Sequence, residues 1–208
     1  MTPELEISGL GLWRGGRRLC QGLGFNMQSG EALQLLGANG TGKTSLLRVL
    51  AGLGRLDEGD VRWKGAAIRS NPEHRAELLY LGHANGLKAH LSPRENYDFY
   101  QSIAAEPSEV TADQALERLG IKEVSGRPSG HLSMGQKRRA ALARLLSVRA
   151  RLWLLDEPLT SLDVDGVALV GELLQDHLRR GGLAVLATHQ TLPSSVIPLR
   201  SLELKAAP

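Results

Sequence analysis

Short, continuous runs of apolar residues recur along the chain and predict strands that are buried on both faces. Segments with apolar positions at helical spacing separate them, and one of these, residues 164–180, ends at Gly181-Gly182. Buried strands that alternate with helices indicate an α/β chain with a mainly parallel sheet. The strands predicted in this way are Ala32–Leu36, Leu78–Leu81, Leu152–Leu155 and Leu183–Ala187.

Two further parts of the chain have their own patterns. Residues 5–13 alternate apolar with small or polar side chains and precede a second strand at residues 19–27, so a small antiparallel β subdomain is predicted beside the main sheet. Residues 92–95, Ser-Pro-Arg-Glu, are typical of a helix start and lie in a helix-rich stretch. We therefore expect a single domain, residues 1–208, with a helical subdomain inserted at about residues 87–147.

A glycine-rich turn follows the run Ala32–Leu36 and leads into an apolar helix. Its spacing fits G-x-x-x-x-G-K-[ST], whose backbone N–H groups surround phosphate oxygens at a helix N-terminus. Lys43 would then reach the β- and γ-phosphates of a nucleoside triphosphate, and Thr44 would offer its hydroxyl to Mg²⁺. An ordinary turn is the alternative. The predicted binding residues are Gly37, Ala38, Asn39, Gly40, Thr41, Gly42, Lys43, Thr44 and Ser45.

Two acidic residues, Asp156 and Glu157, follow the buried run Leu152–Leu155. Because ligands gather at the carboxyl ends of parallel strands, we expect Asp156 to bind Mg²⁺ beside Thr44. Strand alternation sends the side chain of Glu157 another way, where it can polarise an attacking water. A strand capped by an acidic turn is the alternative without function.

A third motif, Leu132-Ser133-Met134-Gly135-Gln136, precedes a strong helix-forming stretch. Ser133 and the N–H groups of residues 134–136 can therefore lie at a helix start and bind an anion. One chain seldom needs two anion sites, so this second one requires an explanation. The basic run Lys137–Arg139 that follows is expected to be a solvated face of the helix.

Composition narrows the functional classes. A net charge of +3, scattered Arg and Lys residues and 4% aromatic residues do not indicate a nucleic-acid partner. The single cysteine, Cys20, excludes an internal disulfide and fits a reducing compartment. Residues 1–6 carry no secretory signal, and the uncharged stretch 181–199 contains His189, Gln190 and two prolines, so no membrane span is expected.

In chain order, residues 37–44, 132–136 and 152–157 resemble the Walker A, signature and Walker B motifs of the ATP-binding cassette (ABC) family. Residues 160–163, Thr-Ser-Leu-Asp, are similar to its D-loop, and Thr188-His189 to its switch histidine, so the resemblance covers nearly the whole chain. It implies an ATPase with a P-loop NTPase core that binds ATP and Mg²⁺. It also implies a head-to-tail dimer with two ATP molecules at the interface.

The resemblance implies roles for individual side chains. Each γ-phosphate would lie between Lys43 of one copy and Ser133 with Gly135 of the other, which explains the two anion sites. Glu157 would orient or deprotonate the attacking water. The remaining expected site residues are His189, which contacts the γ-phosphate, Asp163, which lines the dimer interface, and Gln136 of the signature.

A narrower resemblance rests on residues 81–88, on Gly135–Arg139 and on Ala187–Gln190. Together with the short length, these are similar to the CcmA family, the ATPase subunits of the bacterial cytochrome c maturation system. Most ABC ATPases have a glutamine that senses Mg²⁺ and the transmembrane partner where this chain has His83, so His83 is a candidate metal-site residue. That family usually has Gln-Pro after the histidine, whereas this chain has Ala84-Asn85, and which residue replaces the glutamine stays open.

This narrower resemblance implies a peripheral motor subunit on the cytoplasmic face of the inner membrane, with integral membrane subunits similar to CcmB and CcmC as partners. ATP hydrolysis would be coupled to heme handling or export, or to release of a heme-loaded chaperone, in cytochrome c biogenesis. The chain has no C-x-x-C-H motif and its six histidines are scattered, so no heme site is predicted within it. The alternatives are the ATPase of an unrelated ABC importer or exporter, and a soluble ABC ATPase that acts on DNA or ribosomes.

Aromatic side chains predict two further contacts. Trp13, near the end of the first strand, is a candidate to stack on an adenine ring, with ordinary packing as the alternative. Tyr97, Phe99 and Tyr100 are expected to form an exposed aromatic end of the helical insert, where a helix of a partner could dock. For any single one of these aromatics, packing in the core is the expected outcome.

Overall fold

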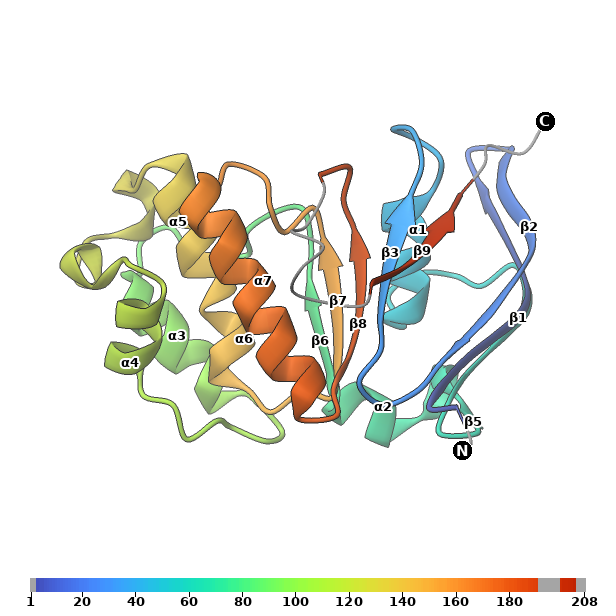
Figure 1. Cartoon of the computed structure of the whole chain (residues 1–208), viewed down its shortest axis with the longest axis horizontal. Coiled ribbons are helices and arrows are strands. Elements are labelled where there is room, and N and C mark those ends of the chain that lie inside the picture. The colour runs from blue at the N-terminus through green and yellow to red at the C-terminus, as the bar shows by residue number, and fades with distance from the viewer. Residues whose placement is uncertain (1–2, 191–198, 205–208) are drawn as a thin grey trace.

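The computed structural model describes residues 3–190 and 199–204, and it confirms the predicted α/β fold (Figure 1). Within these residues, five strands form a parallel sheet in the order β6-β7-β8-β3-β9. Four other strands of the described chain form an antiparallel sheet in the order β2-β1-β4-β5. The parallel strands are β3 (Ala32–Leu36), β6 (Leu78–Leu81), β7 (Leu152–Asp156), β8 (Leu183–Ala187) and β9 (Leu199–Glu203), and the antiparallel ones are β1 (Leu5–Arg14), β2 (Arg17–Met27), β4 (Glu58–Trp63) and β5 (Ala66–Ala67).

Helices cover both faces of the parallel sheet and gather at the end opposite the antiparallel sheet (Figure 1). Residues 93–147 contribute most of the helices of that end, and the prediction of a helical subdomain at about residues 87–147 stays a prediction. The α-helices are α1 (Lys43–Leu50), α2 (Pro72–Ala76), α3 (Pro93–Ser102), α4 (Ala112–Arg118), α5 (Met134–Leu142), α6 (Arg144–Ser147) and α7 (Val164–Arg179), with short 3₁₀ turns at Ile68–Ser70, Lys122–Val124 and Ser129–His131.

Alternation along β7 distributes its side chains between two hydrophobic cores. Leu152 and Leu154 pack with the apolar face of α1, whereas Trp153 and Leu155 pack with the apolar face of α7. All four are at most 5% exposed. The sheet therefore holds α1 and its preceding loop at one face and α7 at the other, with the acidic end of β7 between them.

Strand β9 was not predicted from the sequence. Its two leucines, Leu199 and Leu202, are only half buried and alternate with exposed polar residues. The strand lies at the edge of the sheet, where it pairs only with β3 among the described strands. An edge strand is partly exposed to water, so it lacks the continuous run of apolar residues by which the central strands were predicted. Residues 191–198, which belong to the uncharged stretch 181–199, lie outside the described residues.

Packing in the core, the outcome expected for any single aromatic of residues 97–100, is confirmed for Tyr97. This residue is 1% exposed, and its hydroxyl lies 2.6 Å from the carbonyl oxygen of Val110 and 3.0 Å from that of Leu146. Burial raises the pKa of Tyr97 to about 12. Phe99 and Tyr100 are half buried and meet edge to face, with their ring centres 5.3 Å apart. Tyr97 therefore stabilises the packing of α3 against its neighbours.

A buried histidine in α7 gives the fold a pH dependence. His177 stacks on Trp153, with ring centres 3.9 Å apart and an angle of 8° between the rings, and its Nε2 atom is 3.0 Å from the carbonyl oxygen of Leu183. Burial lowers the pKa of His177 from 6.5 to about 4, although hydrogen bonds to the backbone oppose the shift. The unfolded chain therefore binds a proton at this position at a pH where the folded chain does not, and stability falls as the pH drops from about 6.5 to about 4.

We expect the free energy of unfolding to fall by about 2 kcal/mol between pH 7.5 and pH 5 because of this one group. Replacing His177→Phe keeps a ring against Trp153 and removes the titration. Urea denaturation at the two pH values, followed by circular dichroism, should show a smaller loss in the variant than in the native chain. A His90→Phe control changes an exposed histidine and should match the native chain. Equal losses in all three proteins would contradict the assignment.

Candidate active site

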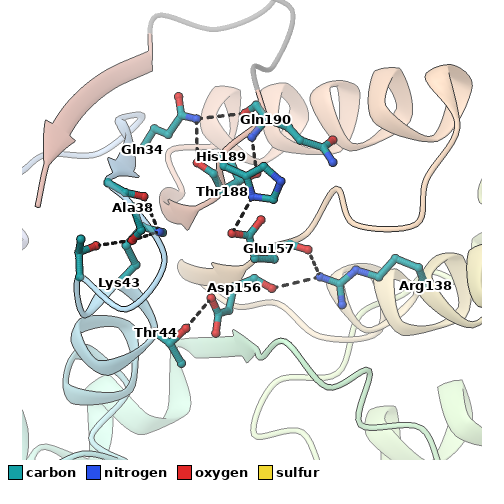
Figure 2. Close-up of polar contacts among 12 residues, drawn as sticks. Gln34, Ala38, Lys43, Thr44, Arg138, Asp156, Glu157, Thr188, His189 and Gln190 are labelled. Carbon is teal, nitrogen blue, oxygen red and sulfur yellow. Dashed lines mark hydrogen bonds and ion pairs between the residues drawn. The ribbon is translucent and has the colours of Figure 1, made fainter. Parts of the chain in front are cut away.

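The glycine-rich turn of residues 37–42, which we call the phosphate loop, connects β3 to α1 at the predicted nucleotide site (Figure 2). Gly37 has a φ of +143°, and a Cβ atom there would lie 2.6 Å from the carbonyl oxygen of Leu204. Gly42, at the N-cap of α1, has a φ of +104°. A side chain at either position would be strained, so the close course of this backbone requires glycine. Among the first-turn residues of α1 there is no acidic side chain, which leaves the helix N-terminus available to an anion.

Lys43 lies within this loop. Its side chain is mostly buried, and Nζ donates to the carbonyl oxygens of Gly37 at 2.7 Å and Ala38 at 3.1 Å (Figure 2). The loop carbonyls thus hold the ammonium group at the centre of the turn. A triphosphate oxygen can take the place of these neutral acceptors, because hydrogen bonds between charged groups are stronger.

Thr44 and Asp156 form the second part of the site. The Thr44 hydroxyl donates to Oδ1 of Asp156 at 3.1 Å, while Oδ2 of Asp156 is buried without a hydrogen-bond partner among the described residues. Burial raises the pKa of Asp156, and the bond from Thr44 and the charge of His83 oppose that shift. A buried carboxylate oxygen left over beside a hydroxyl is an arrangement that fits a hard divalent cation such as Mg²⁺. His83 itself is exposed.

Glu157 points away from Asp156 and toward the loop after β8 (Figure 2). Its Oε1 atom is 3.2 Å from Nδ1 of His189, whereas its Oε2 atom is buried without a hydrogen-bond partner within the described chain. The backbone φ of Glu157 is +49°, a conformation that costs a residue with a side chain about 1 kcal/mol. Its N–H donates to the carbonyl oxygen of Ala187 at 2.7 Å. A carboxylate at this position can serve as a general base for a water molecule that reaches it.

The third motif starts a helix, as predicted. Ser133 is the N-cap of α5 and forms a capping box with Gln136: the Gln136 N–H donates to Ser133 Oγ at 3.2 Å, and the Ser133 N–H donates to Gln136 Oε1 at 3.0 Å. Ser133 is exposed, and α5 lies well apart from α1 across the parallel sheet (Figure 1). Gly135 adjoins the 160–163 segment, because a Cβ atom on it would lie 3.2 Å from the carbonyl oxygen of Ser161. This motif therefore does not close on the phosphate loop of its own chain.

Asp163 and Trp13 are two further predicted site residues. Asp163 caps α7 by accepting from the N–H of Gly166 at 2.9 Å, and it also accepts from Arg139 at 2.7 Å. The bond from Arg139, and then the one from Gly166, lower the pKa of Asp163. The ring of Trp13 is partly exposed and has the guanidinium of Arg18 at 4.5 Å from its centre. The roles of Asp163 at a dimer interface and of Trp13 under an adenine ring stay predictions.

Comparison with known proteins decides the family. The model of the ABC transporter family matches residues 20–160. The cytochrome c biogenesis ATP-binding export protein CcmA of Cupriavidus necator is 49% identical over 98% of this chain and 89% of its own length. The protein of the same name from Methylococcus capsulatus is 50% identical over 90% of this chain and 92% of its own length. The chain belongs to the CcmA family of ABC ATPases.

Solved structures show the same ABC ATPase fold at low sequence identity. A putative ABC transporter ATP-binding protein from Pyrococcus furiosus superimposes with a TM-score of 0.81, at 22% identity and with 96% of each chain covered. The ATP-binding subunit of another ABC transporter gives a TM-score of 0.82 at 21% identity, over 99% of this chain and 89% of the other. Within residues 3–190 and 199–204 of this ABC ATPase, none of the helices is long and apolar enough to cross a membrane.

Two residues beside the site of this ABC ATPase were missed from the sequence. The basic run Lys137–Arg139 was expected to be a solvated face, and this is wrong for Arg138, which is 3% exposed. Arg138 shares a helix face with the buried Ala141 and Leu142, three and four residues later, and this spacing was the signal in the sequence that could have indicated its burial.

Gln34 is a polar residue in the middle of the buried strand β3, and its side-chain amide donates to the carbonyl oxygens of Thr188 and Gln190 at 3.4 and 3.2 Å (Figure 2).

Proposed function

We propose that this ABC ATPase is the ATP-hydrolysing subunit of a membrane complex in cytochrome c biogenesis, where hydrolysis drives heme handling or export, or the release of a heme-loaded chaperone. The observation that carries the proposal is the similarity, over nearly the whole chain, to proteins named as cytochrome c biogenesis export ATPases. The described residues account for the motor part of this function. They supply groups that bind a triphosphate and groups that act on water.

The position of the two predicted anion sites supports a head-to-tail dimer. Lys43 belongs to one site and Ser133 to the other, and they lie on helices that are far apart in one chain (Figure 1). In the proposed dimer, ATP held by the phosphate loop of one copy meets Ser133, Gly135 and Gln136 of the second copy. The exposed hydroxyl of Ser133 and the N-terminus of α5 then contact the γ-phosphate.

The side chains within one copy divide the chemical work. Lys43 and the N–H groups of the loop bind the phosphates, and Thr44 and Asp156 would hold Mg²⁺, which would neutralise charge on the phosphate oxygens. Glu157 orients the attacking water and accepts its proton on the carboxylate. His189, whose side chain is exposed, holds Oε1 of Glu157 and is placed to contact the γ-phosphate.

The proposed partners are integral membrane subunits similar to CcmB and CcmC, and the proposed location is the cytoplasmic face of the inner membrane. Affinity purification of the tagged chain from native membranes in mild detergent tests the partners and the association with a membrane. We expect integral membrane proteins to co-purify and the preparation to show the absorbance of heme, whereas untagged cells processed in the same way should give neither. Co-purification of a solute-specific permease without heme would contradict the proposal and favour the ATPase of an unrelated ABC transporter.

A further inference from the structure

Arg138 lies buried directly behind the two acidic residues of the active site (Figure 2). Its guanidinium donates to three successive carbonyl oxygens, those of Asp156 at 3.1 Å, Glu157 at 2.6 Å and Pro158 at 3.2 Å. Burial lowers the pKa of Arg138, while the carboxylates of Asp156 and Glu157 oppose the shift. A buried cation is costly unless its donors are satisfied, so these carbonyl groups and the guanidinium hold one another in place.

These contacts act on a backbone that is already strained. Glu157 has a φ of +49°. Its N–H donates to the carbonyl oxygen of Ala187 in β8, and its own carbonyl oxygen accepts from Arg138. The residue is thus held at both ends of its backbone. The direction of its carboxylate, toward His189, depends on this held conformation.

A fourth hydrogen bond of Arg138 joins it to a loop outside the active site. The remaining arm of the Arg138 guanidinium donates to Oδ1 of Asn85 at 2.9 Å. Asn85 belongs to the loop of residues 82–86 that follows β6, and this loop is bonded to α3 through the hydroxyl of Tyr100 and the carbonyl oxygen of Gly86. One guanidinium therefore joins the loop before α3 to the backbone of Glu157.

We propose that Arg138 is a positioning residue that sets the backbone of Glu157 for hydrolysis and that couples the loop 82–86 to it through Asn85. The proposal rests on the proposed function, because it assumes that Glu157 acts on the attacking water. When the loop moves Asn85, the buried guanidinium loses one partner and shifts against the carbonyl groups of residues 156–158. The loop thereby controls whether Glu157 is aligned. This assigns to Asn85 part of the coupling that the sequence left open after His83.

Replacing Arg138→Lys tests the positioning role, because a single ammonium group cannot bridge three carbonyl oxygens and an amide. We expect kcat for ATP hydrolysis to fall at least about tenfold while KM changes by less than about twofold. The control Arg118→Lys changes an arginine whose ion pair with Asp176 lies on the surface, and it should keep the native kcat. A purely structural role would lower the melting temperature of Arg138→Lys and leave kcat native below it, and that outcome would overturn the proposal.

Replacing Asn85→Ala tests the coupling without removing a buried charge. We expect a loss in kcat of about threefold in the native chain and no further loss in the Arg138→Lys background. Independent, multiplicative losses would show that the two residues do not act together.

The failure of this proposal can be told apart from the failure of the proposed function. An Arg138→Lys, Glu157→Gln double variant should still form a dimer with ATP, because Arg138 acts after binding. Native turnover of Glu157→Gln alone would reject the catalytic role of Glu157. Native turnover of Arg138→Lys, with Glu157→Gln inactive, would reject only the positioning role.

Discussion

Replacing Glu157→Gln is expected to lower kcat for ATP by a factor of about 10²–10³ and to leave ATP binding intact. The amide has the shape of the carboxylate and can still meet His189, but it cannot take a proton from the attacking water. Hydrolysis then stops with ATP in place, and the dimer should accumulate. Phosphate release measures the first effect, and size-exclusion chromatography with and without ATP measures the second.

A matched control for this substitution is Glu172→Gln, which changes an exposed glutamate on α7. It should hydrolyse ATP at the native rate and show the native balance of monomer and dimer. A Glu157→Gln variant that behaves like this control would remove Glu157 from the mechanism.

Replacing Ser133→Glu is expected to abolish turnover while each monomer still binds ATP. The substitution places a negative charge at the exposed start of α5, where the γ-phosphate held by the second copy would lie, and like charges repel. The phosphate loop of the same chain is distant and keeps its affinity. Nucleotide binding by fluorescence titration and phosphate release in the same preparation separate the two effects.

The substitution also removes an N-cap, which costs about 1 kcal/mol of stability, and this effect has its own control. Thr111 caps α4 in the same type of capping box, with Gln114, so Thr111→Glu should lose similar stability and keep its turnover.

Mixing two inactive variants tests the dimer directly. Lys43→Ala retains an intact third motif and Ser133→Glu an intact phosphate loop, so a mixed dimer contains one complete site. We expect mixing to restore turnover. Absence of rescue, together with hydrolysis by the native chain that does not depend on protein concentration, would contradict a shared site.

Much of the site could be predicted because its geometry is local. The loop before Lys43 is shaped by its own glycines, and the run of apolar residues Leu152–Leu155 identifies the buried strand that ends at Asp156. Short-range backbone rules were sufficient for these features, and they apply to any chain that carries the same residues in the same order.

The surroundings that distant segments provide could not be predicted in the same way. The sequence did not show which of Tyr97, Phe99 and Tyr100 packs in the core, and the hydroxyl of Tyr97 meets carbonyl groups near residues 110 and 146. Arg138 was expected in water, but its partners come from the loop after β6 and from the end of β7. Neither set of acceptors is visible from the residues that surround Tyr97 or Arg138 in the sequence.

By itself, the sequence determined the glycine-rich turn before the first helix and the acidic residues that follow a buried strand, because residue type and near neighbours decide these properties. Only the tertiary structure decided which of these groups meet. Thr44 reaches Asp156 across 112 positions because β3 and β7 lie in one sheet, with β8 between them. Packing of α5 against the end of β7 buries Arg138, which was expected at the surface, and places its guanidinium against the backbone of Glu157. Burial depends on what other elements place around a side chain.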